Sequence, residues 1–181
     1  MRIISGSKKG KKLFTPSSDN IRPTADRARE SIYNILYSKL ENPISDYAFL
    51  DIFSGTGAFG LEALSRGAKS ATFVDKDLTL TKKNVDLCGF KNVSYINKDA
   101  RFLTKSATKY DIIFLDAPYN KDLTIPTINN LISNGYCHPN TLIIAETHKN
   151  EELTLDNNLT IIDQRIYSIA KFSFITLKNV E

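Results

Sequence analysis

Cysteine, histidine and long apolar runs are all scarce in this chain of 181 residues. Its two cysteines, Cys88 and Cys137, lie far apart and lack the spacing of metal ligands. This pattern argues against a disulfide framework and against a zinc site, and it is typical of a reducing compartment. No apolar run approaches the roughly 18 residues of a membrane span, and the N-terminus shows no apolar signal-peptide segment. We therefore expect a cytoplasmic protein that binds neither a membrane nor a metal.

Acidic residues are scarce at the N-terminal end. The first 29 residues contain eight Lys or Arg and two Asp, a net charge of +6, whereas the remaining residues carry a net charge of −2. A basic segment on a nearly neutral body favours a polyanionic partner, above all nucleic acid. A solvated N-terminus without a partner is the alternative. Hydrophobic residues make up 41% of the chain, which suits one globular domain with a sizeable core, and nothing demands more than a monomer.

The apolar pattern predicts an α/β fold. Residues 1–18 suggest two short strands around a Gly- and Lys-rich turn, and residues 22–40 a helix with Ala28, Ile32 and Leu36 on one face. From residue 47 onward, short apolar strands alternate with helices, and the last two strands are expected to be antiparallel. The predicted strands are 47–53, 70–75, 93–96, 110–116, 141–146, 159–168 and 170–178, and the helices are 58–67, 76–89, 99–107 and 124–135. Together they predict a mostly parallel, seven-stranded sheet.

Acidic residues stand at, or within a few residues of, the ends of the first five predicted strands. They are Asp51, Asp75, Asp99, Asp116 and Glu146. Ligands of open α/β sheets bind at the carboxyl ends of the strands, so these residues are the first candidates for a site. Five carboxylates at one edge would be unfavourable without a cationic or amine-rich ligand, unless some of them accept hydrogen bonds or face water.

Residues 55–60, GTGAFG, match the pattern G-x-G-x-x-G between a strand and a helix, and Asp75 follows Gly55 by 20 residues. This spacing suits a dinucleotide site, in which the acid binds a ribose hydroxyl. Asp51 argues against a dinucleotide because it would repel the pyrophosphate, but it suits the ammonium and sulfonium of S-adenosylmethionine. Asp75 would then bind the ribose hydroxyls and Asp99 the adenine edge, while Gly55 and Gly57 allow close backbone approach. The alternatives are turn glycines, a helix N-cap at Asp99 and a surface charge at Asp75.

The run DAPY, residues 116–119, places a carboxylate, a small residue, a proline and an aromatic ring at the exit of an apolar strand. It predicts either a tight turn or a pocket for a flat molecule with an amino group. Together with RPTADRARESIYNIL (22–36) and LDIFSGTGAFGLEALSRGA (50–68), it resembles the ribosomal RNA small subunit methyltransferase D family. The N-terminal block is the specific part, because the middle block is shared by many methyltransferases. The resemblance extends from about residue 1 to about residue 146.

The resemblance implies a single, Rossmann-like, class I S-adenosylmethionine-dependent methyltransferase domain at 24–181, preceded by a basic hairpin or arm at 1–23 that contacts RNA. It implies methylation of the exocyclic N2 amine of a guanine in 16S ribosomal RNA, with the small ribosomal subunit as partner. The implied catalytic residues are Asp116, Ala117, Pro118 and Tyr119. The cofactor-binding residues would be Asp51, Phe53, Gly55, Thr56, Gly57, Asp75, Lys76, Asp99, Ala100 and Asp116. The RNA-binding residues would be Lys8, Lys9, Lys11, Lys12, Arg22, Arg27 and Arg29.

The family usually carries Asp-Pro-Pro-Tyr, so Ala117 departs from its pattern. Ala117 still offers a backbone carbonyl that, with the Asp116 side chain, would accept hydrogen bonds from the target amine, but the loop loses the fixed φ of proline. Tyr119 would stack on the extruded base. Arg27 and Arg29 have an alternative role in ion pairs on the helix surface. Three other functions stay open: methylation of adenine N6 in DNA or RNA, NAD-dependent oxidoreduction, and RNA binding without catalysis.

Overall fold

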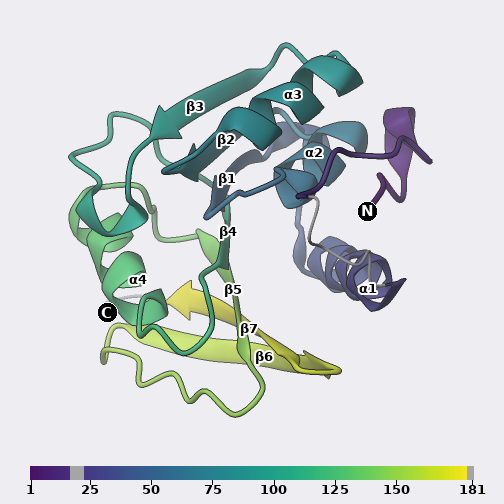
Figure 1. The fold of residues 1–181 in the computed structure, drawn as a ribbon. Coiled ribbons are helices and arrows are strands. Elements are labelled where there is room, and N and C mark those ends of the chain that lie inside the picture. Colours follow the sequence, from purple (N-terminus) through teal and green to yellow (C-terminus); the bar gives the residue numbers. More distant parts are fainter. Residues whose placement is uncertain (17–22, 179–181) are drawn as a thin grey trace.

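The computed structural model describes residues 1–16 and 23–178, with the backbone alone at 23–25. Its sheet has the strand order β3-β2-β1-β4-β5-β7-β6 (Figure 1). Neighbouring strands are parallel except for β7, which is antiparallel to both β5 and β6. The mostly parallel, seven-stranded sheet is thereby confirmed. The strands are β1 (Ala48–Ile52), β2 (Ser70–Asp75), β3 (Val93–Asn97), β4 (Ile112–Asp116), β5 (Leu142–His148), β6 (Leu159–Tyr167) and β7 (Ala170–Leu177).

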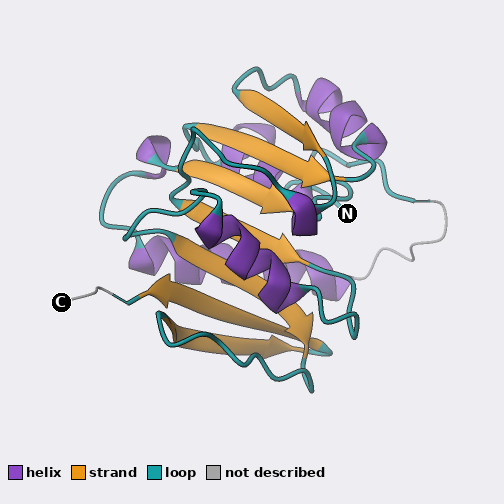
Figure 2. Ribbon diagram, turned by 90° about the vertical axis from the view of Figure 1, so that its left-hand side faces the viewer, coloured by secondary structure: helices purple, strands orange, loops and turns teal. Residues whose placement is uncertain are grey.

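Helices cover both faces of the sheet, as Figures 1 and 2 show. One buried cluster joins α1, α2 and α3 to strand residues such as Phe49, and a second joins α4 to residues such as Leu50. Because both faces are covered, the central strands are apolar at nearly every position. None of the described helices is long and apolar enough to span a membrane. The helices are α1 (Pro23–Lys39), α2 (Ala58–Ser65), α3 (Thr79–Cys88) and α4 (Thr124–Ser133), with 3-10 turns η1 (Gly6–Lys8), η2 (Ile44–Asp46) and η3 (Ala100–Phe102).

The strand order reverses between β1 and β4, which are neighbours in the sheet but not in the chain. In open α/β sheets, the crevice at the carboxyl ends of two such strands is the usual ligand site. Asp51 lies next to the last residue of β1, and Asp116 ends β4. Asp116 is also in register with Glu146 on the parallel strand β5. The fold thus brings three of the predicted acids to one crevice.

The helix predicted at 99–107 is wrong, because the chain forms only the short turn η3 there. The following backbone groups bond to other elements: Ser106 N donates to Asn134 O at 2.9 Å and Tyr110 N donates to Tyr136 O at 2.9 Å. The Ser106 hydroxyl also bonds within the segment, donating to Thr108 O at 2.7 Å and accepting from Thr108 N at 3.1 Å. Such local hydroxyl bonds favour turns over helices.

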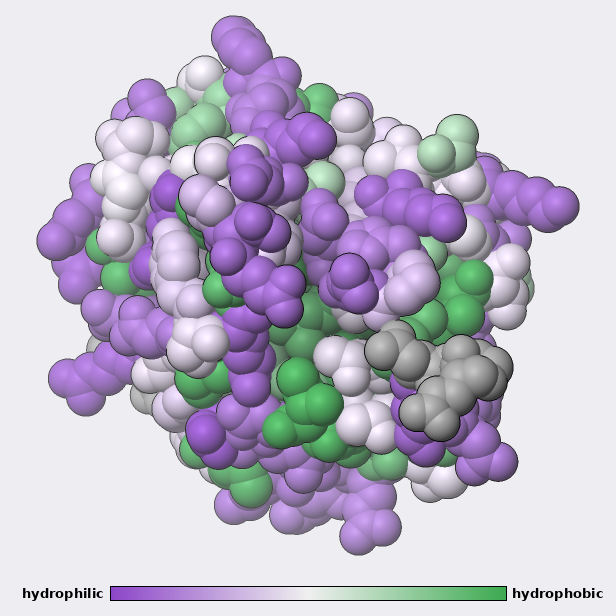
Figure 3. Space-filling view, turned by 180° about the vertical axis from the view of Figure 1, so that it is seen from behind, coloured by the Kyte–Doolittle hydropathy of each residue, from purple (hydrophilic) through white to green (hydrophobic). Residues whose placement is uncertain are grey.

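The N-terminal segment, residues 1–16, packs against α2 and α3 rather than projecting as a free arm. Its two predicted strands pair only briefly, through one bridge between Arg2 and Lys12 and the backbone bonds from Ile3 N to Lys11 O at 2.9 Å and from Leu13 N to Met1 O at 3.2 Å. The buried carboxylate of Glu62 on α2 accepts hydrogen bonds from Ile4 N at 2.7 Å and Ser5 N at 3.0 Å, so these groups are not available for strand pairing. Ile3 and Leu13 are buried. Figure 3 views the molecule from behind, relative to Figure 1, and shows that polar side chains cover most of this side, with apolar ones gathered near its centre.

Candidate active site

A strained glycine loop connects β1 to α2. Phe53, Gly55 and Gly57 all have positive φ, of 59°, 51° and 74°. Glycine adopts this conformation freely, whereas a phenylalanine does so at a cost that marks a functional backbone position. At Gly57, a Cβ atom would also lie 3.0 Å from the Thr81 side chain, so the loop and α3 are in close contact. The predicted turn is therefore present.

Two polar residues of α3 support this loop from behind. Thr81 Oγ1 donates to Gly55 O at 2.8 Å, and Asn84 Nδ2 donates to Thr56 O at 2.9 Å. Both side chains are completely buried. Their role could not be predicted from the sequence, because one Thr and one Asn in a helix are common. Only the packing of α3 brings them to the loop.

Asp51 is a buried carboxylate beside the loop, with 2% of its surface exposed. Its Oδ2 accepts a hydrogen bond from Gly60 N at 2.9 Å. A Cβ on Gly60 would lie 2.5 Å from the Phe73 ring, so glycine is required for this close approach. Burial raises the pKa of Asp51 to about 7, an effect opposed by the Gly60 N–H and by Arg29 and increased by Asp75. A carboxylate whose charge is disfavoured by burial is a favourable partner for a cation.

Asp75 and Asp99 lie on a cavity of about 270 Å³ at the ends of β2 and β3. Asp75 accepts hydrogen bonds from Gly55 N at 2.9 Å and Asp77 N at 3.1 Å. Asp99 bonds to Arg101 Nη2 at 2.6 Å and to Lys76 Nζ at 2.9 Å, and these cations hold the pKa of Asp99 well below its usual range. Asp99 also caps η3, as the alternative interpretation proposed. The structure brings these predicted residues together with Phe53, Ala100, Asp116 and Pro118.

A second cavity, of about 310 Å³, is lined by Asp116 and Tyr119, the two ends of the predicted catalytic run, whereas Pro118 lines the first cavity and Ala117 lines neither. Tyr119 Oη donates to Glu146 Oε1 at 2.6 Å, which fixes the ring in the cavity wall and places its edge against His148. Burial and then the neighbouring Glu146 and Asp51 carboxyls raise the pKa of Asp116 well above its ordinary value. The Asp116 side chain is nevertheless accessible from the cavity, so solvent moderates the effect of burial until a ligand displaces it. Asp116 and Phe53 line both cavities.

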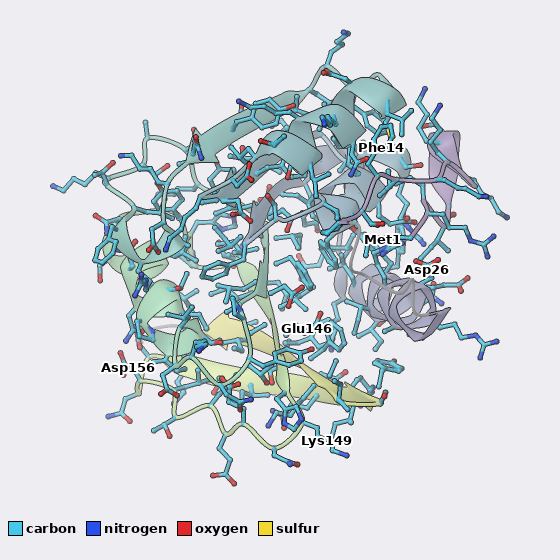
Figure 4. All side chains as sticks on the ribbon, viewed as in Figure 1. Met1, Phe14, Asp26, Glu146, Lys149 and Asp156 are labelled. Carbon is cyan, nitrogen blue, oxygen red and sulfur yellow. The ribbon has the colours of Figure 1, made fainter. Side chains whose placement is uncertain are left out.

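Several residues of this cavity were absent from the predicted site. Glu146 was noted as a strand-end acid, but its bond to Tyr119 follows only from the alignment of β4 and β5. The turn at Ser168 and Ile169 also lines the cavity, together with Tyr167 at the end of β6, Ala170 and Phe172 on β7, and Met1. Figure 4 shows Met1 and Glu146 near α1, although they are distant in the sequence. No local motif could have identified these lining residues, because strands β6 and β7 and the N-terminal segment come next to the site only when the chain is folded.

The predicted RNA-binding residues occupy different environments. Arg29 is a correction: only 8% of its surface is exposed, and its Nη2 donates to Arg2 O and to Asp26 Oδ1, so it is not part of an RNA-facing surface. The ion pair with Asp26 is one that the sequence left open, but it lies inside the protein rather than on the helix surface. Lys8 is half-buried with Nζ 5.9 Å from the Phe90 ring centroid. Arg22 lies outside the described residues, and the exposed members are Lys9, Lys11, Lys12 and Arg27.

The donor set fits S-adenosylmethionine. The two adjoining cavities offer a buried carboxylate for a cationic amino-acid end and further carboxylates for a nucleoside end. Asp51 is unsuited to a pyrophosphate, since a buried carboxylate would repel the phosphate charges. Within residues 1–16 and 23–178, no group of three or more His, Cys, Asp or Glu is arranged to hold a metal ion.

The strand order and this crevice define the class of protein: the chain has the class I methyltransferase fold. A solved structure from Escherichia coli, "Putative methyltransferase yhhF", superposes with a TM-score of 0.84 at 33% identity, over 99% of each chain. The family described as "Conserved hypothetical protein 95" matches residues 1–176.

Curated relatives identify the family more closely. Ribosomal RNA small subunit methyltransferase D of Haemophilus influenzae is 33% identical over 180 residues, which cover 95% of this chain and 91% of that protein. Its counterpart of the same name in Escherichia coli is 39% identical over 151 residues, which cover 81% of this chain and 74% of that protein. The chain belongs to the ribosomal RNA small subunit methyltransferase D family.

Proposed function

We propose that this protein uses S-adenosylmethionine to methylate the exocyclic N2 amine of a guanine in 16S ribosomal RNA. The observation that carries the proposal is the position of Asp116, which lines both the cavity of the nucleoside-binding acids and the cavity of Tyr119 and Asp51. A group at this junction can contact a cofactor on one side and a target base on the other. The names of the relatives indicate small-subunit ribosomal RNA as the substrate.

The chain's own residues suit each part of the cofactor. Asp51 would bind the ammonium group, Asp75 the ribose hydroxyls and Asp99 the adenine amine. Phe53, Lys76 and Ala100 would flank the nucleoside, and the backbone of Gly55, Thr56 and Gly57 would lie against the amino-acid end. When bound, S-adenosylmethionine supplies an electrophilic methyl group.

The residues of the DAPY loop would orient the amine. The Asp116 carboxylate and the Ala117 carbonyl accept hydrogen bonds from its two N–H groups, which directs the nitrogen lone pair toward the methyl donor. The amine gains a methyl group and loses one proton, and the Asp116 carboxylate accepts that proton. The raised pKa of Asp116 makes it a better proton acceptor than an ordinary carboxylate.

Tyr119 would provide the face on which the extruded base stacks, with Pro118 shaping the loop. Its hydroxyl bond to Glu146 holds the ring in place before the base arrives, which reduces the entropy lost on binding. The buried Ala117 would be compatible with activity, because its contribution is a backbone carbonyl. A gain of about hundredfold in rate for Ala117→Pro would contradict this view and would show a loop that is poorly organised.

The exposed cations of the N-terminal segment and α1 would hold the RNA backbone. Arg2, Lys9, Lys12 and Arg27 line one groove between these elements. Their charges suit phosphates, which fix the position of RNA without reading its sequence. Lys8, Lys11 and Arg22 are proposed to assist, with residues 1–23 as the RNA-contacting part of the chain. We propose a monomer that acts in the cytoplasm.

The proposal is tested in cells. Ribosomal RNA from a strain lacking this protein would be compared with RNA from strains restored with the wild type or with Asp116→Ala, and the nucleosides of 16S RNA would be measured by mass spectrometry. One N2-methylguanosine should disappear in the deletion strain, return with the wild type and stay absent with Asp116→Ala. An unchanged N2-methylguanosine content in the deletion strain would contradict the proposal.

A further inference from the structure

Arg29 is a buried cation whose hydrogen bonds leave part of its guanidinium unused. Among the described residues, its two hydrogen bonds are both made by Nη2, to Arg2 O and to Asp26 Oδ1 at 3.1 Å. Its Nε is buried without a hydrogen-bond partner among the same residues. A buried guanidinium normally satisfies its donors, because an unpaired buried N–H is costly. Nη1 makes no hydrogen bond among the described residues, so it is the donor left for a partner in the cavity that Arg29 lines.

Glu62 does not fill this role. Its carboxylate lies 4.0 Å from Arg29 Nε, beyond hydrogen-bond distance. The same carboxylate already accepts bonds from Arg66 Nε at 2.7 Å and from the backbone N–H groups of Ile4 and Ser5. These shorter contacts engage both of its oxygens and hold it away from Arg29. Arg66 is as buried as Arg29, with 8% of its side chain exposed, but it does not line the cavity.

Arg29 lines the same cavity of about 310 Å³ as Asp51, Asp116 and Glu146. Among the described residues that line this cavity, it is the one with a basic side chain. Its positive charge is close enough to lower the pKa of Asp51. Without it, a ligand carboxylate would enter a cavity in which the other charged side chains are all acids.

An α-amino acid carries an ammonium and a carboxylate on one carbon, and both need partners when they leave water. Asp51 suits the first of these groups and Arg29 suits the second. We propose that Arg29 is a binding residue for the carboxylate of the amino-acid end of S-adenosylmethionine, opposite Asp51. The inference rests on the proposed use of this cofactor and replaces the RNA contact that the sequence suggested for Arg29. The guanidinium fork is the side chain best matched to a carboxylate.

The test compares two ligands by isothermal titration: S-adenosylmethionine and its decarboxylated form, which differ in the carboxylate alone. The wild type should bind the first about ten- to hundredfold more tightly, the range of a hydrogen-bonded charge pair. In Arg29→Gln, this preference should fall to within about threefold or reverse, since the decarboxylated ligand is the more cationic and the cavity is then acidic.

Arg66→Gln is the matched control, because it disturbs the same Glu62 network at the same burial without changing the cavity wall. It should lower stability in urea but keep the preference for the carboxylate. The ratio of the two affinities is independent of the fraction of folded protein, so a partly unfolded Arg29→Gln still gives an answer. Equal ratios in the wild type and Arg29→Gln, or equal losses in both variants, would overturn the inference alone. Failure of the wild type to bind S-adenosylmethionine would overturn it together with the proposed function.

Discussion

Asp51 should reduce the stability of the folded chain, and removing its charge should reveal the size of that effect. Its pKa rises from an ordinary 3.8 to about 7 in the fold, which corresponds to about 4 kcal/mol at pH 8. The folded protein holds this proton more tightly than the unfolded chain does. The stability contribution of Asp51 therefore falls as the pH rises from about 4 to about 7. Asp51→Asn removes this dependence and keeps an oxygen that can accept the Gly60 N–H.

The assay is urea unfolding of the wild type and Asp51→Asn, followed by circular dichroism at pH 5 and pH 8. The variant should be more stable by up to about 4 kcal/mol at pH 8 and by roughly 2 kcal/mol at pH 5, because folded wild type is largely protonated at the lower pH. Asp75→Asn is the comparison: it removes a charge that raises the pKa of Asp51, but it also loses one of two oxygens that accept backbone N–H bonds, so its gain in stability should be much smaller. If Asp51→Asn were no more stable than the wild type at pH 8, or gained the same stability at both pH values, the argument from burial would be refuted.

The same substitution should weaken S-adenosylmethionine binding about hundredfold, because the ammonium loses its buried partner. Isothermal titration measures this directly. Undiminished binding by Asp51→Asn would remove Asp51 from the site. A variant that is more stable and yet binds poorly is the expected combination when a buried charge is kept for function.

Three further predictions concern the other parts of the site. Methyl transfer should decline as the pH falls through the raised pKa of Asp116. Glu146→Gln should move this decline to lower pH, because it removes a neighbouring charge. Coinciding pH profiles of kcat for the wild type and Glu146→Gln would contradict the role of Asp116 as proton acceptor. Tyr119→Phe, which loses the bond to Glu146 but keeps the ring, should lower kcat by about tenfold, and Tyr119→Ala by about hundredfold; equal losses would exclude stacking. Charge reversal of Lys9 and Lys12 together should raise KM for the RNA substrate and reduce the salt dependence of RNA binding. Titration should show an unchanged affinity for S-adenosylmethionine. A weaker cofactor affinity would instead indicate a disturbed fold.

The sequence predicted the sheet and the acids at its edge because both depend on regularities of the chain. Apolar strands that alternate with helices form parallel sheets, and the carboxyl ends of parallel strands meet at one rim. Asp51, Asp75 and Asp116 could therefore be placed together before the structure was known. The glycine loop was also predicted, since Gly55 and Gly57 suggest a turn or a close backbone approach, but the positive φ of Phe53 was not.

The remaining features depend on contacts between distant segments. Arg29 looked like one more surface cation of a basic segment, and only the packing of α1 on the sheet turns it into the cavity. The N-terminal segment is held by Glu62 and Asn84, residues that no short motif connects to it. Glu146 needed the alignment of β4 with β5 to become the partner of Tyr119.

The measurement that tests the central claim most directly uses tritiated S-adenosylmethionine. Small ribosomal subunits, free 16S RNA and duplex DNA from a strain lacking this protein would be offered separately to the wild type, with Asp116→Ala as the inactive control. The labelled product would then be digested and identified. Label recovered as N2-methylguanosine from ribosomal RNA, and lost in the variant, is the predicted result. Label on adenine or in DNA, or equal labelling by Asp116→Ala, would contradict the account.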